Sequence, residues 1–531
     1  MTVLALVVAS EPFDWHGGMH NDASQFQDKR HPEQMTIARG EGFIRRHGLW
    51  TEDQHHQALV VRERVGKEKL KLFRVAWADP HGVSRAKTVT APAFLGALDD
   101  GYNINVATAT LDASGARTFS SFTRGGGMDL EEMTGSPNLI IVPDPATFRV
   151  LPWEPDVGWV LCDEYFTSGM PFHFSPRHLL RRQLARLAER GLRCVVGLEV
   201  EWYLLRLAQD HLTAENVGGP GLRGRAPATL PVEPGFSFHS ETNMDLMQQP
   251  IRALADAMDK LGLPLRSIEN EWGPGQLECT FAPRDALEAA DNLVLFRTAT
   301  RQLCRRMGYL ATFMSRPALP GYYSSGWHLH QSLVLGDENA FMPRADGQLL
   351  SPLGQAYLGG LLHHALASTI FANPTINGYR RFRANSLAPD RIAWCSDHRG
   401  VMLRVLGGAN DPASRIENRI GEPSANPYLY ILSQIVAGLD GIDHLRDPGL
   451  PDTDPYTSNR AMLPKSLAEA LSLMAKDALF RSELGQTFVD YYVRLKQTEI
   501  GRFEKFVTEN SLDPTSEATT AWEQDEYFDF F

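Results

Sequence analysis

The sequence predicts an α+β protein with a small sheet-containing domain followed by a larger one, on three observations. A chain of 531 residues is too long for one compact core, so two domains or one elaborated domain are expected. An apolar fraction of 43% and a charged fraction of 22% are typical of a soluble globular protein. Helical and strand-like stretches alternate irregularly, which favours α+β over regular strand–helix–strand units. We expect an N-terminal extension at 1–65, a small domain at 66–172 and the large domain at 173–531.

Charge and composition argue against nucleic-acid and membrane roles. The net charge of −12 repels polyanions, and we find neither a basic stripe nor an amphipathic anchor. Met1–Ser10 is apolar but lacks a basic segment and is too short to span a bilayer, so we expect a buried strand or an ordered arm there. The five cysteines form no C-x-x-C pair, which fits a reducing compartment. A cytoplasmic protein is therefore expected.

The small domain is predicted from a hairpin pattern. Lys71–Ala78 alternates in the manner of a strand, and Asp79–Gly82 supplies turn residues. A second strand-like run, Ala86–Val89, follows. The segment therefore predicts a small sheet.

The large domain is predicted to open with a helix that has recognisable ends. Ser175 is a plausible N-cap before Pro176, and Gly191 is the expected stop. Cys194–Trp202 then reads as a strand, and loops rich in glycine and proline occupy 217–235 and 317–326.

Two pairs of glutamates indicate a metal site. Glu199 and Glu201 lie two apart in a strand-like apolar run, so both side chains point to one face. Adjacent carboxylates repel, so the pair is either a solvated polar face or a set of metal ligands, and the apolar flanks favour ligands. Glu271 and Glu278 bracket a turn with two glycines and a proline, which can bring both carboxylates together. Converging carboxylates suit magnesium or manganese.

Histidines and arginines supply two further patterns. His328 and His330 lie two apart after a glycine, as metal ligands or as a hydrogen-bonded structural pair. The segment Arg415–Arg419 alternates charge around Glu417. It is either a solvated edge strand or, if it faces the same cleft, a carboxylate between two arginines suited to phosphate or carboxylate groups.

Taken in order, these segments resemble the signature of the glutamine synthetase family. The motifs read GLEVEW, EWGPGQLE, GWHLHQS, NGYRRF, HRGVMLR, RIENR and SANPYL, from Gly197 to Leu429. The resemblance extends from about Arg74 to the C-terminus, and several motifs in a fixed order are far more specific than one. It implies a small β-grasp-like domain, a catalytic domain with a curved antiparallel sheet, and a homo-oligomer of stacked rings, a decamer or dodecamer.

The resemblance also implies a role for each matching residue. One metal would be held by Glu201, Glu271 and Glu278, and a second by Glu199, His328 and Glu417, with two or three Mg²⁺ or Mn²⁺ ions per site. The nucleotide side would include His330, Ser332, Arg404 and Arg415. Arg381 and Arg419 would grip the acid substrate, and Arg399 and Arg419 its phosphoryl group. Asp112 resembles an aspartate lent by a neighbouring subunit to the amine site, where Glu271 remains available.

The implied reaction agrees with the chemistry of these residues. A carboxylate is a poor acyl donor, and phosphorylation by ATP gives it phosphate as a leaving group before an amine attacks. This step concentrates negative charge, so metals and arginines must converge where water is excluded.

Three positions depart from the glutamine-forming members and bear on the substrates. Tyr323 and Ser324 replace an asparagine and a glycine that help hold glutamate, and Leu387 stands where a flap glutamate covers the ammonium site. A leucine neither accepts a proton nor attracts a cation. We therefore predict a carboxylate–amine ligase, of glutamate or a related acid, whose amine is larger and more apolar than ammonia. The alternatives are an ordinary glutamine synthetase, a ligase of another acid, and a non-catalytic relative.

Overall fold

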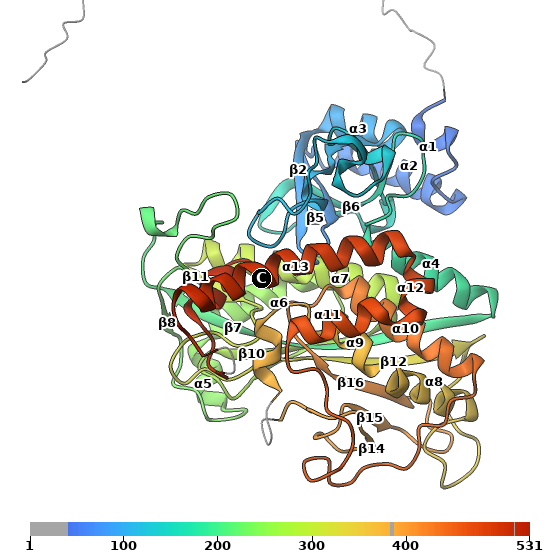
Figure 1. Ribbon diagram of the computed structural model, residues 1–531. Coiled ribbons are helices and arrows are strands. Elements are labelled where there is room, and N and C mark those ends of the chain that lie inside the picture. Colours follow the sequence, from blue (N-terminus) through green and yellow to red (C-terminus); the bar gives the residue numbers. More distant parts are fainter. Residues whose placement is uncertain (1–40, 383–386, 514–515) are drawn as a thin grey trace, which may run out of the picture. The chain divides into compact units, whose positions relative to one another are not determined.

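Two β-sheets and the helices around them make up the chain in the computed structural model, which describes residues 41–382, 387–513 and 516–531 (Figure 1). Residues 43–531 form one compact unit. Most of the predicted extension, including Met1–Ser10, lies outside the described residues. No helix within the described ranges is both long and apolar enough to cross a membrane.

The small sheet contains the predicted hairpin. Its strands are β1 (Leu72–Ala78), β2 (Ser84–Thr90), β3 (Tyr102–Asn105), β4 (Asn138–Pro143), β5 (Arg149–Leu151) and β6 (Glu154–Tyr165). Their order is β2-β1-β6-β4-β3, with β5 also on β6, and every pair is antiparallel except β1 and β6. The β1–β2 hairpin confirms the strand and turn pattern, whereas the β-grasp likeness stays a prediction.

Short helices pack around the small sheet. They are α1 (Phe43–Arg46), α2 (Glu52–Lys67) and α3 (Ala91–Asp100). Phe73 of β1 stacks on Phe94 of α3 with ring centroids 4.1 Å apart, and both rings are fully buried. The residues before 66 therefore belong partly to this region, because Val61 and Val65 of α2 join the same core.

The large sheet is antiparallel apart from one edge pair. Its strands are β7 (Leu192–Leu207), β8 (Thr229–Pro231), β9 (Leu265–Asn270), β10 (Gln276–Asp285), β11 (Tyr309–Thr312), β12 (Trp327–Leu335), β13 (Glu338–Asn339), β14 (Trp394–Ser396), β15 (Leu403–Leu406) and β16 (Arg415–Gly421). The main order is β14-β15-β16-β12-β7-β10-β9, and only β14 and β15 run parallel. The antiparallel sheet and the α+β class confirm the predicted fold.

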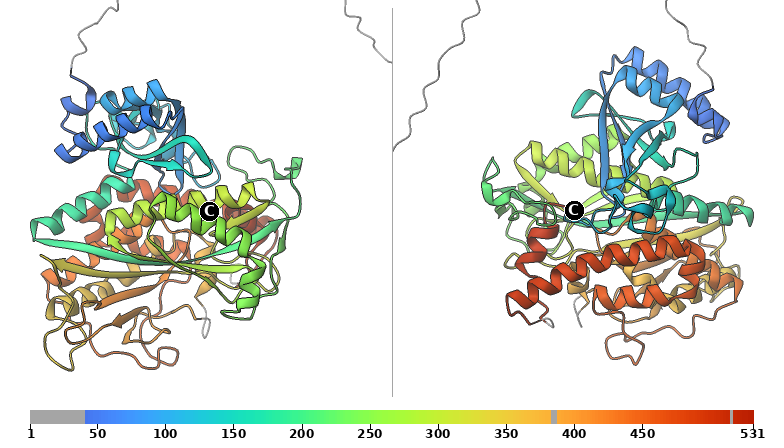
Figure 2. Two further views of the ribbon diagram at one scale, coloured as in Figure 1. Left: turned by 180° about the vertical axis from the view of Figure 1, so that it is seen from behind. Right: turned by 45° about the horizontal axis from the view of Figure 1, so that its top comes forward.

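The remaining helices belong to the large domain, and some of them pack on its sheet while others pack on those helices. They are α4 (Pro176–Glu189), α5 (Glu241–Leu246), α6 (Gln248–Leu261), α7 (Ala286–Arg306), α8 (Pro352–His363), α9 (Ala365–Ala372), α10 (Pro427–Asp443), α11 (Leu467–Lys476), α12 (Ala478–Leu484), α13 (Gln486–Glu509) and α14 (Ala521–Tyr527). The helix α4 starts directly after Ser175, as predicted. Both α4 and α7 contact β7, and Figure 2 shows them in teal and yellow-green along one side of the sheet. Val200 and Trp202 of β7 lie in the core on that side.

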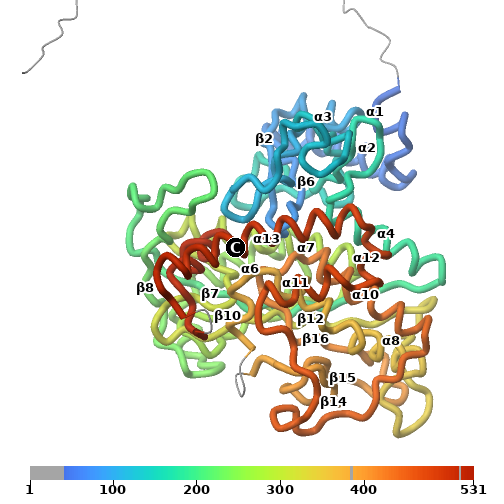
Figure 3. Tube along the Cα trace, in the orientation of Figure 1, coloured from blue at the N-terminus to red at the C-terminus, as the bar shows by residue number. Residues whose placement is uncertain are grey.

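The remaining elements are 3-10 helices and long connections. The 3-10 helices are η1 (Val106–Ala109), η2 (Arg124–Gly127), η3 (Glu131–Met133), η4 (Pro145–Thr147), η5 (Ala214–Asn216) and η6 (Asn377–Arg381). After α10 the chain runs beside β14, where the Asp452 amide donates to the Trp394 carbonyl at 2.8 Å (Figure 3). This connection covers the edge of the sheet that begins with β14.

Buried polar contacts join the small sheet to the large domain. Arg177 of α4 donates to Asp144, Asp163 and Asp291 at 2.7–2.9 Å, and its side chain is only 4% exposed. Since Asp144 and Asp163 come from the small sheet's region and Asp291 from α7, one arginine ties the two regions together. Separating the two regions would leave buried charges of this cluster uncompensated. We therefore expect the two regions to keep one relative position.

Candidate active site

Two rows of polar side chains cross the middle of the large sheet. Glu201 on β7 lies directly opposite Glu278 on β10, and Glu278 lies opposite Glu269 on β9. In the next row, Glu199 on β7 lies opposite His328 on β12. Residues two apart on a strand share a face, so both rows project away from the helices that bury Val200. The strand assignment and shared face predicted for Glu199 and Glu201 are confirmed.

A third row of polar side chains lies on the same face, nearer the edge of the sheet that begins with β14. His330 on β12 lies opposite Glu417 on β16, and Glu417 lies opposite Arg404 on β15. The strand β16 is an interior strand between β12 and β15, and Glu417 is fully buried. The solvated-edge interpretation of Arg415–Arg419 is therefore wrong, and the alternative, a carboxylate facing the common cleft, holds.

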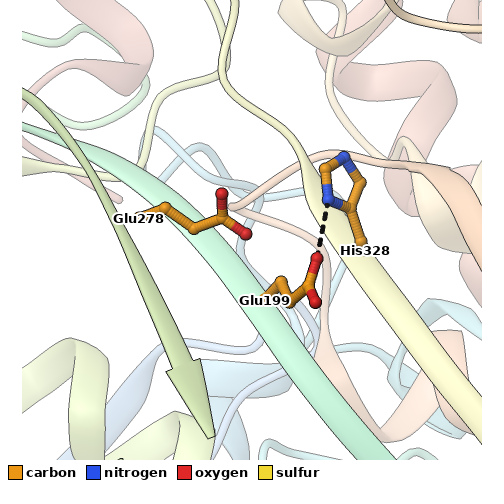
Figure 4. Close-up of side chains that lie close together, drawn as sticks. All are labelled: Glu199, Glu278 and His328. Atoms are coloured by element: carbon orange, nitrogen blue, oxygen red, sulfur yellow. Dashed lines mark hydrogen bonds and ion pairs between the residues drawn. The ribbon is translucent and has the colours of Figure 1, made fainter. Parts of the chain in front are cut away.

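Glu199 is held between two imidazoles. Its carboxylate lies 3.3 Å from Nδ1 of His328 and 2.9 Å from Nε2 of His330. Nε of Arg415 donates to Nδ1 of His330 at 3.1 Å, which leaves the Nε2 hydrogen of that ring for Glu199. Burial raises the pKa of Glu199, but hydrogen bonds from both histidines outweigh it and hold the pKa well below its usual range. Figure 4 shows Glu278 and His328 directed towards the same space as Glu199.

A cluster of three carboxylates occupies the neighbouring corner. Glu201 accepts hydrogen bonds from the Gly326 amide at 2.9 Å and from Nε2 of Gln276 at 3.1 Å. Burial, together with the charge of Glu201, raises the pKa of Glu271 to about 8 and that of Glu278 to about 10. Carboxylates so close together ionise jointly only when a cation compensates them.

The donor set fits a hard divalent cation. Three groups of ligand atoms each lie within 4.8 Å of one another: Glu199, Glu278 and His328; Glu199, His330 and Glu417; His239, Glu269 and Glu271. Carboxylate oxygens dominate these groups, and no cysteine belongs to them, so magnesium or manganese fits better than a thiolate-preferring metal. Five of the six predicted ligands fall in these groups, and Glu201 lies opposite Glu278. The division into two ligand sets stays a prediction.

Arginines line the side of the cleft that leads to β15 and β16. Glu417 lies 3.1 Å from Arg404 and also pairs with Arg419. Burial raises the pKa of Glu417, but the charges of Arg419 and the two histidines outweigh it and lower the pKa. Nε of Arg419 donates to the Arg399 carbonyl at 3.0 Å, which fixes one arginine against the next. The result is a concentration of positive charge suited to phosphate or carboxylate oxygens.

Hydrogen bonds hold Tyr323 and Ser324, two of the three residues that depart from the family pattern. The Tyr203 hydroxyl donates to the Tyr323 carbonyl at 2.9 Å and accepts from the Tyr323 amide at 2.8 Å. The Ser324 hydroxyl accepts from Arg316 at 3.0 Å. Arg381 lines the same cavity and is buried, and its Nη1 donates to the carbonyls of Ile420 and Gly421. Burial lowers the pKa of Arg381.

Two cavities meet at Glu199 and Thr280. One, of about 320 Å³, contains the carboxylate cluster and Tyr323, Ser324, Leu387, Arg381, Arg399, Arg404 and Arg419. The other, of about 400 Å³, is lined by His330, Ser332 and Arg415. The structure thus gathers almost every predicted site residue along one continuous depression. Arg404, predicted on the nucleotide side, lies in the first cavity.

Asp112 is the exception. It is buried, its carboxylate pairs with Nε of Arg502 at 2.7 Å, and it accepts a hydrogen bond from the Ser114 hydroxyl at 2.7 Å. The charge of Arg502 and these hydrogen bonds outweigh burial and lower its pKa. It does not line either cavity of its own chain, so a role in a neighbouring subunit's site stays a prediction.

The mouth of the first cavity contains aromatic residues that the sequence analysis missed. Phe238 and Trp272 stack with ring centroids 5.4 Å apart, and both rings are more than a third exposed. Leu387 lines the same cavity and is 55% exposed. Trp272 directly follows Glu271, so its place near the cavity could have been predicted from the sequence of that loop. Phe238 lies in a loop without periodicity, and nothing in its sequence context gives its position.

Comparisons with known proteins agree with the motif analysis. A sequence profile described as the glutamine synthetase catalytic domain matches residues 173–514. The chain is 43% identical over 493 residues to the gamma-glutamylanilide synthase of an Acinetobacter species, covering 92% of this chain and 98% of that protein. It is 30% identical over 468 residues to the glutamate–isopropylamine ligase of a Pseudomonas species, covering 86% and 97% of the two chains.

Solved structures resemble the fold over most of its length. A structure described as apo GmaS without ligand has a TM-score of 0.69 and 27% identity, covering 84% of this chain and 96% of that chain. A structure described as a GmaS/ADP complex has the same TM-score and 26% identity, covering 85% and 98%.

Proposed function

This chain belongs to the glutamine synthetase family, and from that premise we propose that it is an ATP-dependent ligase joining the γ-carboxyl of glutamate to an amine other than ammonia. The observation that carries the proposal is the mouth of the first cavity, where apolar Leu387 and exposed aromatic rings stand beside the carboxylate cluster. An ammonium ion gains little from such a surface, whereas an amine with an organic substituent buries apolar area against it.

The names of two relatives support this choice. The gamma-glutamylanilide synthase and the glutamate–isopropylamine ligase are both named for joining glutamate to an organic amine. Both match over more than four fifths of this chain and nearly all of their own length. The same chemistry therefore fits this chain as a whole.

The proposed reaction has two steps. In the first, an oxygen of the substrate carboxylate attacks the γ-phosphorus of ATP, an O–P bond forms, and the bond to the departing ADP breaks. In the second, the amine nitrogen attacks the acyl carbon, the C–N bond forms, and phosphate leaves with the C–O bonding electrons. The nitrogen loses a proton, and the products are the amide, ADP and phosphate.

The arginines are proposed to hold the anionic groups of both steps. Arg399, Arg404 and Arg419 line the cavity beside Glu417 and would contact the phosphoryl group, while Arg381 and Arg419 would hold the acid. Arginine suits this role because its planar guanidinium donates in pairs to phosphate or carboxylate oxygens. Such contacts stabilise charge most where water is excluded.

Divalent cations are proposed for the carboxylate face. Glu201, Glu271 and Glu278 would hold one ion, and Glu199, His328 and Glu417 another. When bound, these ions would neutralise phosphate charge and polarise the acyl group. The raised pKa values of Glu271 and Glu278 support the fit, since a cation restores their ionised form.

The second cavity is proposed to take the nucleotide. Its lining includes His330, Ser332 and Arg415, and it joins the first cavity at Glu199, where the γ-phosphate must meet the acid. We further propose a cytoplasmic ring-shaped homo-oligomer in which Asp112 of one subunit serves the amine site of the next.

Phosphate release across a grid of acids and amines tests the proposal. We expect ATP-dependent release with glutamate and an organic amine, at a kcat/KM at least about tenfold above that with ammonia. Equal turnover with ammonia would identify an ordinary glutamine synthetase. Turnover with another acid alone would keep the ligase and reject glutamate, and silence throughout would favour a non-catalytic relative.

A further inference from the structure

A second set of arginines lines a cavity that shares no lining residue with the two cavities of the candidate active site. This cavity, of about 480 Å³, lies between the turn that joins β1 to β2, one side of α7 and residues 529–531, and we call it the junction cavity. We infer that the junction cavity binds a small organic anion, a carboxylate or a phosphate that has a compact apolar part. The inference goes beyond the proposed ligase activity and does not depend on it, because binding alone tests it.

The charges of the lining are unbalanced. Its arginines are Arg297, Arg301, Arg305 and Arg306, all on α7, and Asp529 is the one acidic residue among its described lining residues. The chain as a whole has a net charge of −12, so overall composition does not account for this concentration of positive charge. An anion is the ligand that such a field attracts.

Three of the arginines project from one face of α7. Arg297, Arg301 and Arg305 are spaced four apart, so their side chains are neighbours on the helix surface. Like charges at this spacing repel and destabilise a helix. Burial and the charge of Arg305 outweigh the attraction of Asp529 and lower the pKa of Arg301. A bound anion would therefore compensate charges that the fold itself brings together.

Arg297 is buried with little to compensate its charge, whereas the other three arginines are at least partly exposed. Its Nη2 donates to the Pro423 carbonyl, and its Nε has no hydrogen-bond partner within the described part of the chain. Burial lowers its pKa to about 9, although Glu422 lies close enough to oppose this effect. An incompletely compensated buried charge is costly, so an anion nearby would be stabilising.

The carboxylates beside the cavity are each shared between two arginines. Asp529 lies 2.6 Å from Arg305 and 3.6 Å from Arg301. Glu154 pairs with Arg306 and also with an arginine of β1. Two carboxylates thus serve four guanidinium groups, and donor capacity remains for the oxygens of a ligand.

Apolar residues line much of the rest of the cavity, among them Val83, Val294, Leu310 and Phe530. A volume of about 480 Å³ is that of a small-molecule site, and apolar walls with a few convergent polar groups are typical of such sites. The anionic group would lie against the arginines and the apolar part against these walls. Inorganic phosphate would leave the walls uncovered, which favours an organic anion.

The core of the large sheet separates the junction cavity from the cleft. The guanidinium carbon of Arg297 lies 5.7 Å from the ring centroid of Trp327, which is fully buried on β12. The next residue, His328, lines the first cavity of the active site on the other face of the sheet. An anion in the junction cavity therefore contacts none of the arginines that line the cleft.

Binding of benzoate and of phenyl phosphate to the full-length protein, measured by saturation-transfer NMR, tests the inference. Benzamide is the control ligand, because it has the shape of benzoate without the charge. We expect at least one of the two anions to bind with a Kd of about 1 mM or below, and benzamide to bind at least about tenfold more weakly than benzoate if benzoate is that anion. The two anions distinguish a carboxylate site from a phosphate site.

Variants locate the bound anion. Arg301→Gln and Arg305→Gln should each weaken its binding about tenfold, whereas Arg399→Gln, in the cleft, should change it by less than about twofold. Arg399→Gln is the matched control, since the cleft arginines are also suited to carboxylates and phosphates. Arg305 is 40% exposed, so Arg305→Gln should fold even if Arg301→Gln does not, and thermal unfolding verifies this.

Each other outcome overturns the inference. Absence of binding by both anions would reject the site, and equal binding of benzamide and benzoate would make it an apolar cavity only. Binding lost in Arg399→Gln but kept in Arg305→Gln would place the anion in the cleft. If wild type binds neither anion and Arg305→Gln changes the oligomeric state in size-exclusion chromatography, the cavity is a contact between subunits instead.

Discussion

Glu201 and Glu278 face each other directly across β7 and β10, two carboxylates on neighbouring strands with Glu271 beside them. Opposed like charges destabilise a sheet, and the fold tolerates this arrangement by keeping protons on the cluster, as the raised pKa of Glu278, about 10, indicates. The same cluster gains when a cation binds its ionised form. An arrangement that is suited to binding a cation therefore costs stability in the centre of the large sheet.

Stability without divalent cations should fall as pH rises. The folded-state pKa values of Glu271 and Glu278 lie above the unfolded value of 4.5, so the folded protein binds more protons between that value and about 8 for Glu271 and about 10 for Glu278. The free energy of unfolding therefore decreases through this window, and magnesium should offset the decrease. Thermal unfolding with chelator or magnesium, from about pH 6 to about pH 9, measures both effects. A magnesium-induced rise in Tm that does not grow with pH would contradict the prediction.

Glu201→Ala and Glu417→Ala should both abolish phosphate release, but with different effects on stability. Removing Glu201 takes an anion away from Glu278 and also removes the acceptor of two hydrogen bonds, so the cation-free Tm should fall less than in Glu417→Ala. Removing Glu417 leaves Arg404 and Arg419 without their buried partner, which costs about 3–5 kcal/mol. Activity assays and thermal unfolding of both variants provide the comparison. Equal destabilisation would show that repulsion at Glu201 is unimportant.

Leu387→Glu should raise the use of ammonia relative to an organic amine that is uncharged at neutral pH, because only a protonated amine gains from the new carboxylate. Leu387 is 55% exposed at the cavity mouth, so a glutamate there would attract a cation in a largely solvated setting. A unit-charge pair in water contributes about 1 kcal/mol at contact, which predicts about a fivefold gain in the ratio of kcat/KM values. Leu387→Gln is the control, because it has the same size and no charge. An unchanged ratio in Leu387→Glu would mean that this position does not govern amine choice.

The sequence predicted which residues line the cleft better than it predicted which of them lie next to one another. Period-two spacing placed Glu199 and Glu201 on one face because a strand leaves no other option. It could not tell that His330 faces Glu417, since strand register depends on the pairing of β12 with β16, segments far apart in the chain. For the same reason the solvated-edge alternative for β16 remained open until the sheet order was known.

The aromatic residues at the cavity mouth escaped prediction for a different reason. Phe238 is positioned by two backbone hydrogen bonds to residues more than thirty positions away, not by any local pattern. Its loop contains non-glycine residues with positive φ, which local preference disfavours. Tertiary contacts determine such a loop, so only the folded chain reveals which ring reaches the cavity.

Subunit mixing tests whether Asp112 serves a neighbouring chain. Asp112→Asn lacks the carboxylate that we propose serves the next subunit, and Glu201→Ala lacks a proposed metal ligand in its own cleft, so each variant alone should be inactive. If the proposed ring forms from equal amounts of both variants, about one site in four pairs an intact cleft with an intact Asp112, because each half of a site is drawn independently. Activity near a quarter of wild type is expected, with each variant refolded alone as the control. If Asp112 acts only within its own chain, or merely secures Arg502 there, every subunit keeps one defect and mixing restores nothing.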